Sequence, residues 1–215
     1  MYEKGIQTRN HIYNIAKQLF YDLGYTKTRI QQITETADVP MGLFSYYFKT
    51  KDKIAEQIYS EFNVNINQRI TETFQKGFEN SIIRNAVHAW IYYDKLLNNP
   101  NNRRFHREIM TTKSNYRGFR RYYHDFYIRY ANDFNLYISD EDLDTLVLME
   151  YGARREYFLH YFKHNLSTTI DEIVFLINGT MPRLLGIEQN TVSTLLHKGI
   201  ALAKTVPSDD LTLLV

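Results

Sequence analysis

Apolar residues in the first part of the chain recur at intervals that suit an α-helix. The positions are Ile12, Ile15, Ala16, Leu19, Phe20 and Leu23. Because an α-helix turns every 3.6 residues, this spacing places all six side chains on one stripe. Gly24 follows directly, and glycine is common just after the last turn of a helix. The pattern therefore predicts an amphipathic helix that ends near residue 23.

A second, shorter helix is predicted after it. Thr28 can cap this helix, which carries Ile30, Ile33 and Ala37 on one side. The run Asp38-Val39-Pro40 then interrupts the pattern, because Asp tolerates left-handed backbone and Pro suits the first turn of a new helix. A tight turn is therefore expected between two short helices.

The helical pattern continues to residue 204. The third helix, near residues 40–46, is barely two turns long, and Thr50 is placed to cap a long helix that begins near Lys51. Only 4 prolines and 9 glycines occur in 215 residues, which favours helix over a turn-rich β architecture. Polar breaks frame further helices near 51–75, 81–97, 102–110, 116–135, 142–164, 168–185 and 189–204. We therefore predict an all-α fold, with residues 206–215 as a loose tail.

Composition excludes several classes of protein. The chain has no cysteine, which rules out a disulfide scaffold, a thiolate metal site and a cysteine nucleophile. The longest purely apolar run is residues 173–177, far short of the roughly 20 residues of a membrane span. The first residues also lack the apolar core of a signal peptide. We expect a soluble, cytoplasmic protein without a membrane partner.

The charge is unevenly distributed along the chain. The 26 Lys and Arg residues nearly balance the 24 Asp and Glu residues, for a net charge of +2. Residues 1–53 carry a net charge of +3 and residues 54–215 a net charge of −1. A polyanionic partner is therefore expected at the N-terminal end of the chain.

The predicted order of helix, short helix, tight turn and short helix is that of a helix-turn-helix. In this motif two helices brace a third, whose exposed face enters the DNA major groove, about 12 Å wide. Inward anchors within the third helix and its flanks are Val39, Leu43, Phe44 and Phe48. The outward face then consists of Met41, Gly42, Ser45, Tyr46 and Tyr47, which suits close approach to DNA.

These residues carry a resemblance to a known family. The chain resembles, over residues 5–55, the DNA-binding domain of tetracycline-repressor (TetR) family regulators. The matching run is Thr8-Arg9, Ile12, Ala16, Leu19-Phe20, Gly24-Tyr25, Thr28, Ile33, Ala37-Asp38-Val39, Gly42-Leu43-Phe44 and Tyr47-Phe48-Lys49-Thr50-Lys51. The resemblance implies a DNA-binding domain at 1–50 and a helical effector-binding and dimerisation domain at 51–205. It also implies a ligand-responsive regulator, most often a repressor, that binds double-stranded operator DNA as a homodimer.

The resemblance implies a role for individual residues at the DNA. Thr28 and Arg29 correspond to phosphate contacts at the start of the second helix, and Gln31 to a base contact. Lys51 corresponds to a phosphate-binding lysine at the N-terminus of the fourth helix. The expected recognition helix contributes Met41, Gly42, Ser45, Tyr46 and Tyr47.

A dimer interface is expected on the two helices predicted at 142–164 and 168–185. A symmetric operator needs two recognition helices about 34 Å apart, and hence two copies of the chain. These two helices have the strongest apolar stripes after residue 53, although both stripes could instead form intramolecular core. The candidate interface residues are Leu146, Tyr151, Phe158, Ile173 and Ile177.

Basic and aromatic residues alternate in the middle of the chain. Residues 103–129 hold eight Lys and Arg residues against two acidic residues. A helix with a solvated basic face and an aromatic core face would produce this pattern. It also suits a pocket for a planar or anionic effector, or an auxiliary nucleic-acid surface. The candidate pocket residues for an unidentified small molecule are Tyr92, Tyr116, Arg120, Tyr123 and Tyr127.

No metal, cofactor or catalytic site is predicted. Glu156, His160 and His164 follow one helix face, but three such ligands spread over about 12 Å cannot close one metal site. A ligand from another helix, such as His124, would be needed, so surface histidines are the favoured interpretation. The chain has no Gly-rich phosphate loop, nucleophile elbow or His-Glu-x-x-His motif. The rival hypothesis is a helical enzyme or small-molecule carrier with an incidental helix-turn-helix-like subdomain.

Overall fold

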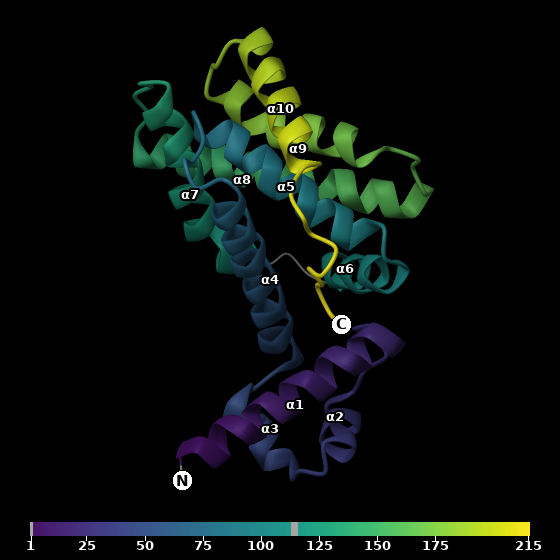
Figure 1. The fold of residues 1–215 in the computed structure, drawn as a ribbon. Coiled ribbons are helices and arrows are strands. Elements are labelled where there is room, and N and C mark those ends of the chain that lie inside the picture. The colour runs from purple at the N-terminus through teal and green to yellow at the C-terminus, as the bar shows by residue number, and fades with distance from the viewer. Residues whose placement is uncertain (1, 113–115) are drawn as a thin grey trace. The chain divides into compact units, whose positions relative to one another are not determined.

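The computed structural model describes residues 2–112 and 116–215, with side chains for 3–112 and 123–215. Within these ranges every regular element is an α-helix, which confirms the predicted all-α fold (Figure 1). Among the described residues no helix is long and apolar enough to cross a membrane. The helices are α1 (Tyr2–Leu23), α2 (Ile30–Thr36), α3 (Met41–Tyr47), α4 (Lys51–Thr73), α5 (Ser81–Leu97), α6 (Pro100–Thr112), α7 (Tyr116–Asp133), α8 (Asp140–His164), α9 (Ile170–Leu184) and α10 (Gln189–Ala203).

The predicted helix ends agree with the structure to within a few residues, because local signals set them. Gly24 takes the left-handed φ of 87° after α1, and Asp38 takes a φ of 50° in the turn before α3. The hydroxyl of Thr50 accepts a hydrogen bond from the backbone of Lys53 at 3.3 Å, as expected for the cap of α4.

The predicted cap of α2 is wrong. Arg29 occupies the N-cap position, and its backbone N–H donates to the side-chain oxygen of Gln32 at 2.8 Å. Thr28 is instead fully buried and donates its hydroxyl backwards, to the carbonyl of Gly24 at 2.7 Å. It satisfies carbonyl groups at the end of α1, which would otherwise lack partners.

The chain divides into two compact units. The first contains residues 1–65, 95–109 and 209–215, and the second contains residues 66–94 and 110–208. Three helices, α4, α5 and α6, pass from one unit to the other. Compactness therefore does not divide the chain at residue 50, and the predicted DNA-binding domain at 1–50 remains a functional prediction.

An aromatic core holds the first unit together. The ring of Phe20 on α1 lies 5.5 Å from the rings of both Tyr25 and Phe105. Tyr59 on α4 contacts the same Phe105 ring at 5.8 Å. Phe105 belongs to α6 and lies 85 positions after Phe20, so a residue far away in the sequence helps to hold α1 and α4 together.

The last ten residues form no helix, but they are not loose. Leu211, Leu213 and Leu214 are buried, and residues 209–215 belong to the first compact unit. The prediction of a loose tail is wrong. Pro207 and the Asp pair prevent a helix, but burial of the three leucines is favourable and orders the segment without one.

In the second unit α8 packs against both α7 and α9, and α9 packs against α10. Close approach of α10 to α5 depends on Gly199. A Cβ atom at this position would lie 2.5 Å from the Cβ of Ala86 and 2.8 Å from the carbonyl oxygen of Ile83. No side chain fits there, so the glycine lets the two helices touch through backbone.

Candidate functional site

Helix α3 is anchored on one face and exposed on the other. Phe44 is fully buried and Phe48, directly after the helix, is nearly so, with their rings 6.0 Å apart. Tyr46 is 77% exposed, and Met41, Gly42 and Ser45 are exposed with it. The helix therefore presents a continuous uncharged face to its surroundings, as a recognition helix must.

Tyr47 differs from the other four predicted recognition residues, because it is half-buried. Its ring packs edge-on against the ring of Tyr46 at 5.0 Å. Its hydroxyl lies beside Gly5 of α1, 3.4 Å from the position of a Cβ atom there. Tyr47 thus links the recognition helix to α1 and supports the exposed ring of Tyr46.

The predicted contacts at the start of α2 separate into one buried and two exposed side chains. Thr28 is buried and hydrogen-bonded within the chain, so its hydroxyl cannot reach a phosphate. Arg29 and Gln31 are exposed. Gln31 donates to the carboxylate of Glu35 at 2.7 Å, and this exposed bond would have to open before Gln31 pairs with a base.

Lys51 connects the start of α4 to the turn between α1 and α2. Its ammonium donates to the carbonyls of Tyr25 at 2.8 Å and Thr28 at 2.6 Å, and it lies 4.4 Å from the centre of the Tyr25 ring. Partial burial lowers the pKa of Lys51, against the opposing charges of Asp52 and Glu108. Two of its three N–H donors are used, which leaves one for a phosphate.

Two exposed lysines flank the same surface and were missing from the predicted contacts. Lys27 lies in the turn before α2, and Lys49 lies in the turn after α3 with a left-handed φ of 63°. Basic residues in the turns beside a helix-turn-helix are a sequence signal that could have identified them.

Helix α6 holds the turn between α1 and α2. A guanidinium nitrogen of Arg104 donates to the carbonyls of Tyr21 and Asp22, at the end of α1. The carboxylate of Glu108 accepts a hydrogen bond from the backbone of Thr26 at 2.7 Å. A Cβ atom on Gly24 would lie 2.8 Å from the same carboxylate. The position of the turn therefore depends on α6.

The second unit contains a buried ion pair on α8. Glu150 is 1% exposed, and one of its carboxylate oxygens accepts from the Nε of Arg154 at 2.9 Å and from a second guanidinium nitrogen. Arg154 also donates to the hydroxyls of Tyr93 at 2.9 Å and Tyr127 at 3.0 Å. The guanidinium carbon of Arg154 lies over the ring of Tyr123, 5.7 Å from the ring centre. We call these five residues the tyrosine–arginine cluster.

The electrostatics of this cluster follow from burial and from the ion pair. Burial would lower the pKa of Arg154, but the Glu150 carboxylate and the tyrosines raise it well above its ordinary value. Burial raises the pKa of Tyr127 well above its ordinary value, against the opposing effect of Arg154. All the tyrosines of the cluster are therefore neutral hydrogen-bonding groups.

The predicted effector residues are partly brought together. Tyr123 and Tyr127 belong to the tyrosine–arginine cluster, and Tyr92 packs against Tyr93 with a ring distance of 5.4 Å. The side chains of Tyr116 and Arg120 lie outside those that the structure describes. Glu150 and Arg154 were not among the predicted effector residues. Their i,i+4 spacing among apolar neighbours is the signal for a buried pair.

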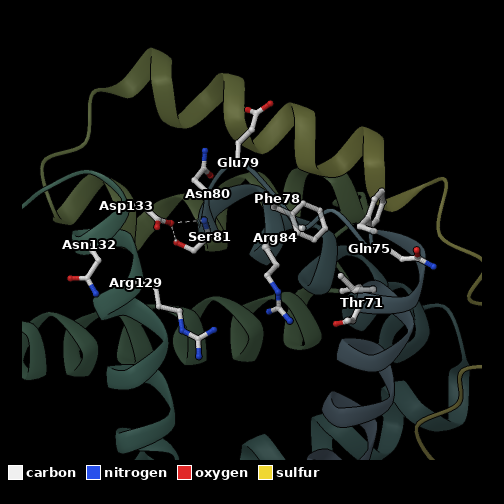
Figure 2. Close-up of a pocket in the computed structure, with 13 residues that line it drawn as sticks. Thr71, Gln75, Phe78, Glu79, Asn80, Ser81, Arg84, Arg129, Asn132 and Asp133 are labelled. Carbon is white, nitrogen blue, oxygen red and sulfur yellow. Dashed lines mark hydrogen bonds between the residues drawn. The ribbon is translucent and has the colours of Figure 1, made fainter.

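An open pocket of about 410 Å³ lies elsewhere in the second unit, at the end of α4, the start of α5 and the end of α7 (Figure 2). Asp133 accepts from both the backbone and the hydroxyl of Ser81, at 2.6 Å each, and so caps α5. Arg84 and Arg129 also line the pocket. Tyr92, Tyr123 and Tyr127 are not among its described lining residues, so this pocket is distinct from the cluster.

Three of the five predicted dimer-interface residues are wrong. Phe158, Ile173 and Ile177 are buried within the chain, so they form its own core and are not available to a partner. Leu146 and Tyr151 are half-buried. The other faces of the same two helices expose the apolar residues Leu148, Met149, Leu176 and Leu184. An apolar stripe identifies a helix that packs, and periodicity alone does not separate core from interface.

His160 and His164 lie on the exposed surface of α8, with ring centres 4.2 Å apart. The residues with described side chains include no group of three or more His, Cys, Asp or Glu residues that could hold a metal ion.

Comparison with known proteins finds a family that matches this part of the chain. The model of the family described as bacterial regulatory proteins, tetR family, matches residues 12–58, which span the helix-turn-helix. Residues 12–58 of the chain are therefore similar to the tetR family, and the match does not extend to the rest of the chain.

Individual relatives of this chain are repressors by name. It is 32% identical over 91 residues to the HTH-type transcriptional repressor NemR of Escherichia coli strain K12, a match that covers 42% of this chain and 44% of NemR. It is 31% identical over 67 residues to the HTH-type transcriptional repressor DhaR of Mycobacterium sp. strain GP1, covering 31% and 34%. The matches thus span less than half the length of either relative.

The fold extends beyond these matched segments. The crystal structure of RolR in complex with resorcinol aligns with 91% of this chain and 96% of that chain, with a TM-score of 0.63 and 16% identity. At this identity the alignment shows a shared fold over nearly the whole chain, and not a shared ligand.

Proposed function

We propose that this chain is a ligand-responsive transcriptional regulator that binds operator DNA through α3 and leaves it when a small molecule binds in the second unit. The observation that carries the proposal is the exposed face of α3, held by buried Phe44 and Phe48, inside the segment that matches the tetR family. This arrangement allows a helix to enter the major groove without losing its support.

Within this proposal the exposed residues of α3 read the bases. Met41 and Tyr46 offer an apolar contact and a ring edge, Ser45 a hydroxyl, and Gly42 leaves room for close approach. Phosphates are contacted by the exposed basic and polar residues of the flanking turns. We assign this role to Arg29, Lys27, Lys49 and the remaining donor of Lys51, with Gln31 reaching a base edge and Tyr47 supporting Tyr46.

A second copy of the chain completes the proposed regulator. Leu148 and Met149 on α8 and Leu176 and Leu184 on α9 are apolar and exposed, and the two helices pack together. Exposed apolar side chains on two helices that pack together suit a protein–protein contact. A two-fold contact there would form a four-helix interface and place two recognition helices on one operator.

The proposed effector acts by a shift of population. A molecule that binds more tightly to the form whose recognition helices misfit the operator draws the protein away from DNA. The tyrosine–arginine cluster is the proposed binding region, because it gathers buried polar groups and aromatic rings. RolR, which shares the fold, was crystallised with the aromatic ligand resorcinol.

The first test is binding to DNA from the upstream region of the chain's own gene, followed by fluorescence anisotropy. We expect tight binding to a palindromic site, weakened by Tyr46→Ala by roughly tenfold or more, because the substitution removes an exposed base contact and no core contact. Tyr137→Ala is the matched control, since Tyr137 is 97% exposed on the second unit. Equal affinity for the palindrome and for unrelated DNA would favour the rival helical carrier or enzyme.

The dimer face has its own test. Leu148→Glu places a charge on the exposed apolar face of α8, and we expect sedimentation velocity to show monomer at concentrations where the unaltered chain is dimeric. Val64→Glu is the matched control, because Val64 is 60% exposed and Leu148 is 52% exposed. Loss of the dimer in both variants, or in neither, would place the interface elsewhere.

A further inference from the structure

The tyrosine–arginine cluster carries no net charge that a ligand could neutralise. The guanidinium of Arg154 already donates to Glu150, Tyr93 and Tyr127. An anionic ligand would have no unpaired cation to bind, and the carboxylate of Glu150 would repel it. A cationic ligand would need the carboxylate of Glu150, but the guanidinium of Arg154 already lies 2.9 Å from it and would repel the ligand. Since moving an uncompensated charge into a buried site is costly, the cluster favours a neutral molecule.

One acceptor in the cluster is unused. The Oε1 atom of Glu150 holds Arg154, whereas Oε2 is buried and has no hydrogen-bond partner in the structure's described part. A buried acceptor without a partner is destabilising, and natural proteins rarely retain one. A molecule that donates an O–H to Oε2 would remove this penalty and gain a bond to a charged group.

A second unpartnered group lies close by on α8. The hydroxyl oxygen of Tyr157 is buried without a partner among the described residues, and Tyr157 interacts electrostatically with Tyr93 of the cluster. A hydroxyl can donate or accept. The cluster and its border therefore offer a ligand one acceptor of full charge and one group that adapts to either role.

Aromatic rings pack against one another within and beside the cluster. Tyr123 stacks on Tyr127 at 6.0 Å and meets the edge of Tyr151 at 5.9 Å. Tyr93 and Tyr157 both pack against Phe158, at 5.3 and 5.5 Å. Such rings attract another aromatic ring, through stacked or edge-on contacts. Tyr123, Tyr151, Arg154 and Tyr157 keep part of their surface exposed, which provides an approach to the cluster.

We infer that the tyrosine–arginine cluster binds a small, neutral aromatic molecule that carries a hydroxyl group, with this hydroxyl donating to Oε2 of Glu150. The inference rests on the proposed function, and it names the chemical class of the effector. Of the planar and the anionic effector that the basic middle of the chain suggested, it selects the planar one, because Glu150 already neutralises the one arginine of the cluster.

The test is a ligand series measured by isothermal titration calorimetry on the full chain without DNA. Phenol is the neutral donor, and anisole has the same ring without a donor. Benzoate and benzylamine supply the anion and the cation. We expect phenol to bind roughly ten- to a hundredfold more tightly than the other three, because a hydrogen bond to a charged group contributes this much. Equal binding of anisole, tighter binding of benzoate or benzylamine, or no binding of phenol would overturn the inference.

Two variants tie the preference to the cluster. Glu150→Gln replaces the free acceptor with an amide that can donate instead, and we expect the advantage of phenol over anisole to disappear. Glu141→Gln, the same substitution at an exposed carboxylate of the same helix, should keep that advantage. If Glu150→Gln fails to fold, the ligand series on the unaltered chain decides alone. Operator binding, measured separately without any ligand, tests the proposed function, so a regulator with another effector is distinguished from a protein that is no regulator.

Discussion

Replacement of Phe44 by alanine is expected to lower the free energy of unfolding of the first unit by about 3–5 kcal/mol. Phe44 is fully buried and supplies the inward face of α3. This helix has only 7 residues and no hydrogen-bonding side-chain cap, so its stability comes from packing rather than from helix propensity. Without the ring, α3 loses its support, and operator affinity should be lost with it.

Urea denaturation followed by circular dichroism, with hydrogen exchange of the amides in residues 30–48, measures this effect. Met41→Ala is the matched control, because Met41 begins the same helix and is 51% exposed. We expect it to change stability by less than about 0.5 kcal/mol, as exposed substitutions usually do. Protection of the α3 amides in Phe44→Ala equal to that in the unaltered chain would contradict this account.

Replacement of Arg154 by methionine is expected to destabilise the second unit by about 3–5 kcal/mol, because it leaves the carboxylate of Glu150 buried without its cation. The hydroxyls of Tyr93 and Tyr127 lose the same donor. The effect should appear as a lower midpoint of thermal or urea unfolding. It should exceed the effect of removing an exposed ion pair such as Lys53 and Glu56, which contributes little.

The double variant Glu150→Met with Arg154→Met separates charge from packing. When both partners become apolar side chains of similar length, no buried charge remains, and most of the lost stability should return. A double variant as unstable as Arg154→Met alone would show that the arginine acts through its contacts with the tyrosines and not through Glu150. A double-mutant cycle on urea midpoints gives the coupling between the two residues directly.

Local sequence signals determined the helices of this protein and their ends. Steps of three and four residues between apolar positions defined α1, and Gly24, Asp38 and Thr50 marked turns and a cap that the structure contains. These features depend only on residues a few positions apart, so they can be read from the chain. The helix-turn-helix and its exposed α3 face follow from the same local information.

Long-range packing decided which side chains are free to act. Thr28 was a plausible cap and phosphate contact by its position, but a fold that buries it leaves its hydroxyl only the carbonyls at the end of α1. Phe158 and Ile173 belong to apolar stripes on helices that were expected to pair, yet those faces form the core of one chain. An apolar stripe indicates that a helix face is buried, but it does not indicate whether the same chain or a second copy covers that face.

The sequence by itself determined the all-α architecture, the approximate helix boundaries and four of the five residues expected on the exposed face of α3, because each is set within a few turns of helix. Only the tertiary structure decided that α6 holds the turn after α1 and that Lys51 donates to the backbone of the same turn. It also decided that Arg154, paired with Glu150, donates to tyrosines from α5 and α7. These contacts join residues up to 83 positions apart, and burial, which no local pattern specifies, sets their strength and their chemistry.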